Sequence, residues 1–253
     1  MKMNQLSNTA KILFIFIILF GLYHAAEYLI VFQNNAAGFL LVQFAFFVTA
    51  YFLGRWYSGD GLSTWGLPLK GRKNFLVGVA CGVLIYGASY LVSIHTGVES
   101  ITKVPDWITV VKASAPFAFG VLLSSFSEDI LTRGLVYAHF KNKLQPIWLV
   151  SLSAIVYVLN HIYRLGDGIE PILYLFLLGV IFFIPLLRTK NLWLTGFMHW
   201  SGNTFFFIFH NVIQTESSSD LISPNYLFSI CLIFFIPIVW FVSKAYLKEE
   251  VPH

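Results

Sequence analysis

The sequence contains few charged residues. Only 11% of its 253 residues are Asp, Glu, Lys or Arg, whereas a soluble domain carries about a quarter. So few charges cannot solvate the surface of a water-soluble protein of this size. Disorder is excluded as well, because disordered chains are poor in aromatic residues and 18% of these residues are Phe, Trp or Tyr. Cysteine is also scarce, and Cys81 and Cys231 both lie in apolar runs, which excludes a disulfide scaffold.

The chain is instead rich in long apolar runs. Hydrophobic residues make up 57% of it, and its mean hydropathy is +0.74. A helix that spans a membrane needs about 20 mostly apolar residues, and the runs are continuous, unlike the short alternating segments of a membrane β-barrel. We therefore predict one integral-membrane domain over residues 1–253, an all-α polytopic bundle of about eight transmembrane helices. The predicted spans are 11–32, 37–54, 74–95, 116–140, 146–165, 169–187, 191–212 and 226–247.

The cations of the predicted loops are distributed unevenly. If the N-terminus is cytosolic, twelve Lys and Arg residues fall on the cytosolic side and three on the other, which is the asymmetry of the positive-inside rule. We therefore expect both termini in the cytosol and the protein in the cytoplasmic (inner) membrane of a bacterium. Its expected partners are membrane lipid and a substrate, with no nucleic acid. The twelve are Lys2, Lys11, Arg55, Lys70, Arg72, Lys73, Lys141, Lys143, Arg188, Lys190, Lys244 and Lys248, and the three are Lys103, Lys112 and Arg164.

Two stretches need a separate interpretation. The first apolar run follows cations, as in a signal peptide, but it is long and a whole membrane domain comes after it, so an ordinary first span is favoured. Residues 96–115 carry an apolar patch beside Trp107, and we expect this patch to form a short helix in the membrane interface.

Ionisable and amide side chains occur inside three predicted spans. Such residues are costly in lipid, and they are functional-site candidates by default. The fourth span contains Glu128, Asp129 and Arg133, the fifth contains Asn160 and His161, and the seventh contains His199 and Asn203.

Helical spacing predicts which of these side chains share a face. Asp129 and Arg133 are i,i+4 neighbours and can form an ion pair. Glu128 points about 100° away from Asp129, so it is free to face a cavity. Tyr157 and His161 share a face of the fifth helix, and His199 and Asn203 share a face of the seventh.

This set of residues suits hydrolysis. A carboxylate in an apolar site beside a histidine can take a proton from water and make a nucleophile. A second imidazole and a carboxamide can stabilise the oxyanion that forms when a peptide carbonyl is attacked. The set Glu128, His161 and His199 could instead bind zinc and leave a position for water, although the usual HExxH signature is absent. Helix packing through interhelical hydrogen bonds and ion or proton transport are alternatives that spacing alone leaves open.

The order and spacing of these residues resemble the CPBP family of intramembrane proteases. The family includes the CAAX prenyl endopeptidases and the bacterial Abi or bacteriocin-processing proteins. The resemblance is carried by Glu128-Asp129-xxx-Arg133-Gly134, Tyr157-xxx-His161 and His199-xxx-Asn203. It covers about residues 116–212, which we expect to be the catalytic core, while the flanking spans match only in number and hydropathy.

The resemblance implies a role for each matching residue. Glu128 would be the general base that activates water, with His161 assisting, and His199 and Asn203 would stabilise the oxyanion. Arg133 would hold the second acid of the first motif, which is Asp129 here where the family has Glu. The aromatic residue of the second motif is Tyr157 here where Phe is usual. A metal-free mechanism is favoured over one with a divalent metal such as zinc.

The expected activity is therefore that of an intramembrane endopeptidase. Its substrate would be a membrane-associated protein or peptide, for which a lipidated chain and a leader peptide are candidates. A non-catalytic bacteriocin self-immunity or binding protein of the same fold is the main alternative, followed by a small-solute or proton-coupled transporter. Outside the motifs, His210 shares a helical face with Asn203, and lining the outer mouth of a cavity is a minor alternative for it.

Overall fold

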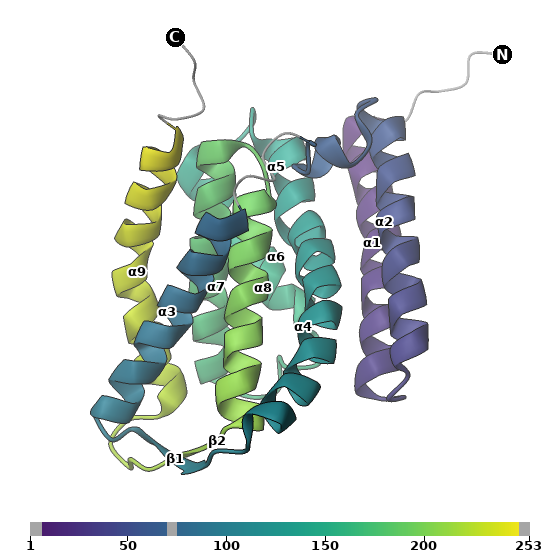
Figure 1. The fold of residues 1–253 in the computed structure, drawn as a ribbon. Coiled ribbons are helices and arrows are strands. Elements are labelled where there is room, and N and C mark those ends of the chain that lie inside the picture. Colours follow the sequence, from purple (N-terminus) through teal and green to yellow (C-terminus); the bar gives the residue numbers. More distant parts are fainter. Residues whose placement is uncertain (1–6, 70–74, 248–253) are drawn as a thin grey trace, which may run out of the picture.

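Eight long helical runs pass up and down through the bundle in the computed structural model, which describes residues 7–69 and 75–247 (Figure 1). Each run coincides with one predicted span, so the all-α polytopic fold is confirmed. The runs are α1 (Asn8–Val31), α2 (Ala36–Tyr57), α3 (Phe75–His95), α4 (Trp107–Asp129) with η3 (Ile130–Gly134) and α5 (Leu135–Phe140), α6 (Pro146–Asn160), α7 (Ile169–Thr189), α8 (Trp193–Phe207) with η4 (Ile208–Val212), and α9 (Pro224–Leu247).

The two ends of the bundle differ in what they carry. The start of α1 and the end of α9 lie at one end, here named the terminal end (Figure 1). At the opposite end, here named the strand end, β1 (Glu99–Lys103) pairs with β2 (Gln214–Ser217) as an antiparallel two-stranded sheet. The sheet ties the α3–α4 connection to the segment that follows α8.

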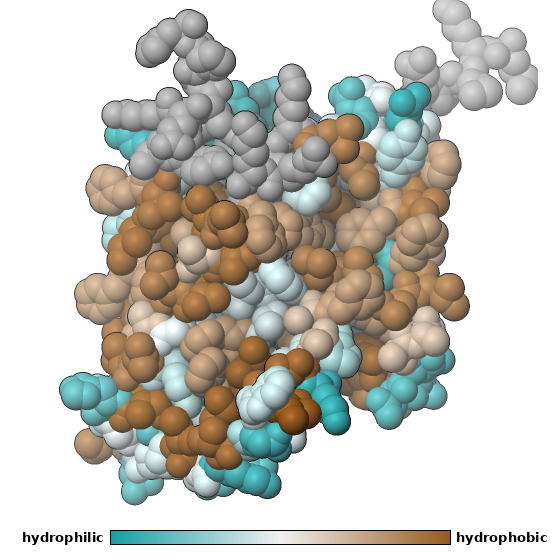
Figure 2. Space-filling model, viewed as in Figure 1, coloured by the Kyte–Doolittle hydropathy of each residue, from teal (hydrophilic) through white to brown (hydrophobic). Residues whose placement is uncertain are grey.

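The surface of the helices is apolar over most of the height of the bundle. Figure 2 shows a broad hydrophobic band with hydrophilic residues gathered toward the two ends. Among the described residues, six helical runs are long and apolar enough to cross a membrane. The exceptions are α6, of 15 residues, and α8, whose 15 residues continue directly into η4. A 15-residue helix is only about 22 Å long, which is shorter than the roughly 30 Å hydrocarbon core. The chain is an integral membrane protein, and both α6 and α8 carry candidate site residues.

Two predicted boundaries and one predicted element are wrong. The fourth span begins at Trp107 rather than at 116, because Asp106 caps it by accepting a hydrogen bond of 3.0 Å from the backbone N–H of Thr109. The patch beside Trp107 is therefore the first part of α4 and not a separate interfacial helix. The fifth span ends at Asn160 rather than at 165, since the chain turns through residues 161–167.

The predicted orientation in the membrane stays a prediction. Lys2, Lys70, Arg72, Lys73 and Lys248 lie outside the described residues. The other cations assigned to the cytosol lie on segments at the terminal end, and the three assigned to the outside lie on segments at the strand end (Figure 1). Which of the two ends faces the cytosol is a property of the protein in its membrane.

A five-residue π-helical segment, η3, joins α4 to α5. It packs against the short helix η1 (Gly61–Trp65). Gly134 lies so close to this helix that a Cβ atom would overlap the backbone carbonyl of Trp65. Trp65 is fully buried and donates a hydrogen bond of 2.7 Å from its indole N–H to the carbonyl of Ala50. The α2–α3 connection is thereby anchored beneath the segment that follows Asp129.

Candidate active site

Three helical segments bring polar side chains to one buried point of the bundle. Glu128 lies at the C-terminal end of α4, His161 directly follows the last residue of α6, and His199 lies in the second turn of α8. Helix α4 packs on α8, and α6 packs on η3. These contacts place residues from distant parts of the sequence beside one another.

Glu128 is at the centre of this polar cluster. Its Oε1 accepts a hydrogen bond of 3.0 Å from Nδ2 of Asn160 and lies 3.7 Å from Nδ1 of His161. Its Oε2 lies 3.6 Å from Nε2 of His199. Only 7% of the side chain is exposed, and the exposed part lines a cavity. The two histidines predicted to act with Glu128 therefore lie one against each of its oxygens.

Asp129 contacts two partners. It forms the i,i+4 ion pair with Arg133 that the spacing predicts, and both side chains are fully buried. Its Oδ1 also lies 3.2 Å from Nδ1 of His199. A carboxylate that is paired with a guanidinium group can only accept hydrogen bonds, so this contact requires a proton on Nδ1 of His199. Asp129 therefore both neutralises Arg133 and orients the His199 ring.

The guanidinium group of Arg133 has further partners. Its Nη1 donates a hydrogen bond of 3.1 Å to Oγ1 of Thr132. Its Cζ lies 4.4 Å from the ring centre of Tyr157 and 5.1 Å from that of Phe182, distances at which an aromatic face attracts a cation. Tyr157 also lines the cavity, so this residue joins the buried ion pair to the open part of the site.

His161 is held by the chain that precedes it. Although it follows the last residue of α6, its ring still lies 4.7 Å from that of Tyr157. Its Nδ1 is 2.8 Å from the carbonyl oxygen of Tyr157. The carbonyl accepts, so Nδ1 carries the proton, and Nε2 of the neutral ring keeps a lone pair that can accept one.

The site opens into a cavity of about 330 Å³. Asn203, one helical turn after His199, lines this cavity together with Glu128, His161 and His199. The structure therefore brings all four residues predicted to be catalytic to one cavity, and it places Arg133 and Asp129 behind them. Aromatic residues form much of the remaining wall: Tyr86, Tyr90, Tyr174, Phe205, Phe206 and Phe228.

A second acid–histidine contact lies in the same cavity, at the strand end. Nε2 of His210 is 3.2 Å from Oε1 of Glu99, which is the first residue of β1 and is buried. Burial alone would raise the pKa of Glu99, but hydrogen bonds from His210 and Ser93 and the charge of His210 lower this pKa below its usual value. His210 thus lines the cavity mouth, which was the minor alternative for it.

Two features of the site are absent from the sequence-based prediction. Asn160 stands out in the sequence as an amide inside a span, but nothing there indicates that it donates to Glu128, 32 residues earlier. Glu99 lies in a connection between spans, where an acidic residue is ordinary, so the sequence carries no signal for its burial. Contacts between helices depend on their packing, which spacing within one helix does not determine.

The described part of the chain offers no ready metal site. Within residues 7–69 and 75–247, no group of three or more His, Cys, Asp or Glu side chains is placed to hold a metal ion. Glu128, His161 and His199, the set named for zinc, therefore do not form such a group in the observed arrangement. Whether the reaction is metal-free stays a prediction.

Comparison with known proteins gives one family. Residues 111–205 match the model of the family described as "Type II CAAX prenyl endopeptidase Rce1-like". The match spans most of α4, all of η3, α5, α6 and α7, and most of α8, and it confirms the resemblance to the CPBP and CAAX proteases. No curated protein and no solved structure matches the chain significantly.

Proposed function

We propose that this protein is an intramembrane endopeptidase that hydrolyses a peptide bond of a membrane-associated protein or peptide. The observation that carries the proposal is the position of Glu128, with Asn160 and His161 at one oxygen and His199 at the other. The family matched by residues 111–205 consists of CAAX-type proteases, which supports a hydrolase. The integral membrane fold supports a substrate that is itself associated with lipid.

In the first step a water molecule attacks the peptide carbonyl. Glu128 takes a proton from the water as its oxygen bonds to the carbonyl carbon, and the carbonyl π electrons move onto oxygen. The hydrogen bond from Asn160 fixes the carboxylate, and the cavity beside it can admit both water and substrate.

The oxyanion that forms needs hydrogen-bond donors. Asn203 can donate from Nδ2, and His199 can donate from Nε2 when its ring is protonated, since Nδ1 already carries the proton directed at Asp129. The contact with Asp129 holds the ring so that its Nε2 lies 3.6 Å from Oε2 of Glu128. The buried pair behind the site thus positions the nitrogen that His199 presents to the oxyanion.

In the second step the C–N bond breaks and the leaving amine takes a proton. Glu128 holds the proton that came from water and can donate it to the nitrogen of the leaving amine. His161, whose Nδ1 lies 3.7 Å from Oε1 of Glu128, helps to position the carboxyl group. The products are a carboxylic acid and an amine. The proton taken from water is the one that the leaving amine receives, so no further reactant is needed.

The test is the substitution Glu128→Gln, which keeps the size of the side chain and removes its basicity. Purified full-length wild type in liposomes is incubated with a panel of synthetic leader peptides and C-terminally lipidated peptides, and products are identified by mass spectrometry. We expect Glu128→Gln to abolish every cleavage found with the wild type while the melting temperature is retained. Glu27→Gln, at another acid within a helix but on α1, is the matched control and should cleave normally. Undiminished cleavage by Glu128→Gln would contradict the proposal.

A further inference from the structure

The cavity of the candidate site opens in one direction. Its deepest side chains are the least exposed, with 1% of His199 and 7% of Glu128 in contact with solvent. Exposure then rises to 18% at His161, 23% at His210 and 50% at Arg164. All five residues line the same cavity, so this gradient shows where it meets the outside.

The outer part of the cavity is lined by residues from the strand end of the bundle, of which Glu99 is buried and the others are more exposed. Glu99 begins β1, His210 lies in η4 just before β2, Arg164 lies between α6 and α7, and Asn225 lies at the start of α9. These four elements meet at the strand end (Figure 1). The cavity therefore runs from Glu128 toward that end.

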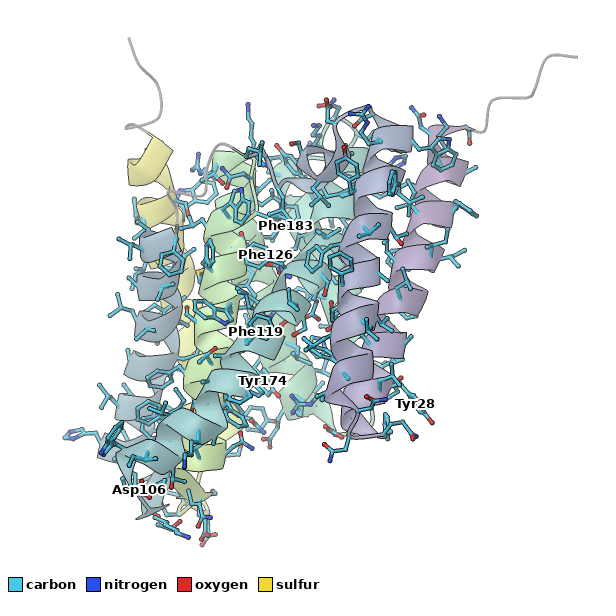
Figure 3. All side chains as sticks on the ribbon, turned by 45° about the vertical axis from the view of Figure 1, so that its right-hand side comes forward. Tyr28, Asp106, Phe119, Phe126, Tyr174 and Phe183 are labelled. Carbon is cyan, nitrogen blue, oxygen red and sulfur yellow. The ribbon has the colours of Figure 1, made fainter. Side chains whose placement is uncertain are left out.

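On its other side the site is closed by a buried apolar cluster, here named the plug. Every residue of the plug is at most 2% exposed. Phe126 and Phe183 lie toward the terminal end, whereas the cavity residue Tyr174 lies toward the strand end (Figure 3). A hydrogen bond of 2.6 Å from the backbone N–H of Leu192 to the carbonyl of Gly66 holds two loops over this region. The plug consists of Trp65, Ile130, Leu131, Leu135, Phe183, Leu186 and Leu192.

Charge indicates which side of the membrane the open end faces. The segments at the strand end carry Lys103, Lys112 and Arg164, and the remaining described loop cations lie at the terminal end. By the positive-inside rule the terminal end is cytosolic. We propose that the site is reached from the strand end and that this end faces away from the cytosol, so that the substrate is a polypeptide segment presented at the outer face of the membrane. This inference rests on the proposed endopeptidase function.

The lining of the cavity adds a condition on the substrate. The aromatic wall suits apolar side chains beside the scissile bond, and the polar rim suits the polar chain that leaves the membrane.

The experiment places one cysteine at each end of the full-length chain. Asn225→Cys puts a thiol at the cavity rim, and Asn142→Cys puts one on the exposed α5–α6 connection at the terminal end. Each variant, expressed in a bacterial inner membrane, is treated with a membrane-impermeant maleimide in spheroplasts and in inverted vesicles. Peptide mass mapping identifies the labelled cysteine, so Cys81 and Cys231 stay in place. Peptide cleavage is then compared before and after labelling with a bulky maleimide.

We expect Asn225→Cys to react in spheroplasts and Asn142→Cys to react in inverted vesicles. The bulky label at Asn225→Cys should reduce cleavage to the level of Glu128→Gln, and the label at Asn142→Cys should leave it unchanged. Reaction of Asn225→Cys only in inverted vesicles would overturn the inference, as would full cleavage with the rim labelled. If the wild type cleaves no peptide, the proposed function fails, and the labelling pattern alone still decides which side the cavity faces.

Discussion

Asp129 shows how one side chain serves both stability and the candidate chemistry. Within residues 7–69 and 75–247 its carboxylate is the only ionic partner of the fully buried Arg133, and it also contacts Nδ1 of His199. The i,i+4 spacing was enough to predict the first contact, because both residues lie on one helical face. The second contact joins α4 to α8, 70 residues apart, and only packing could place it.

We expect Asp129→Asn to destabilise the protein by about 3–5 kcal/mol, because it leaves the guanidinium of Arg133 buried and unpaired. The measurement is thermal unfolding of the purified protein in detergent. The matched control is Asp167→Asn, which removes the partner of Arg164 in an ion pair whose two side chains are each 50% exposed. That change should cost less than about 1 kcal/mol. Equal melting temperatures for the two variants would refute the role given to Asp129.

Asn160 gives a second prediction at the scale of a residue. Asn160→Ala removes the hydrogen bond to Glu128, and a hydrogen bond to a charged group is worth about 1.5–3 kcal/mol, so we expect kcat/KM to fall by about 10- to 100-fold. The fold should be retained. Asn142→Ala, at an exposed site on the α5–α6 connection, is the control and should have wild-type kinetics. Wild-type kcat/KM for Asn160→Ala would mean that Glu128 is positioned without it.

At the scale of elements, apolar runs predicted which segments are helical, whereas local capping and turns decided where they end. Asp106 extends α4 toward its N-terminus, and the turns after Asn160 end α6 early although apolar residues continue. The early end has a consequence for the site, since it frees His161 from the helix while its ring stays beside Tyr157. Hydropathy averages over about 20 residues, so it does not resolve such events.

The contact between η3 and η1 can be tested with glycine variants. Gly134→Ala places a methyl group against the carbonyl of Trp65, and such overpacking typically costs about 1–3 kcal/mol. We expect a lower melting temperature and reduced cleavage, because η3 follows directly on Glu128 and Asp129. At Gly166 a Cβ atom would meet nothing within 4 Å, so Gly166→Ala is the control and should behave as wild type. An unchanged melting temperature for Gly134→Ala would show that η3 and η1 can move apart without loss of stability.

At the scale of the whole molecule, the pair Glu99–His210 ties the α3–α4 connection to the end of α8 at the cavity mouth. The folded state lowers the pKa of Glu99 below its usual value of 4.5. A carboxylate whose pKa is depressed by folding binds fewer protons in the folded state than in the unfolded state. Its contribution to stability is therefore full above about pH 4.5 and is lost as the pH falls through the depressed value.

We expect the melting temperature to fall below about pH 4.5, and Glu99→Gln to make this fall smaller. Melting curves from pH 3 to pH 7, about the range in which carboxylates titrate, measure the difference between variant and wild type. Glu216→Gln, at an exposed acid of the neighbouring strand, is the control and should keep the wild-type dependence on pH. A Glu99→Gln curve parallel to the wild type would show that the pair does not stabilise the fold.

The sequence by itself determined the class of protein and the number of helical runs, and it indicated the candidate site residues, because hydropathy and the spacing within one helix are local properties. It also indicated an orientation, through the uneven distribution of cations. Only the tertiary structure decided that Asp129 meets His199, that Asn160 meets Glu128 and that the plug closes one end of the cavity. Those features depend on how helices pack against each other over distances that no local pattern records. The small number of charged residues and the positions of the buried charges thus have different physical origins. The surrounding lipid limits the number of charges, and packing between helices determines where the buried charges lie.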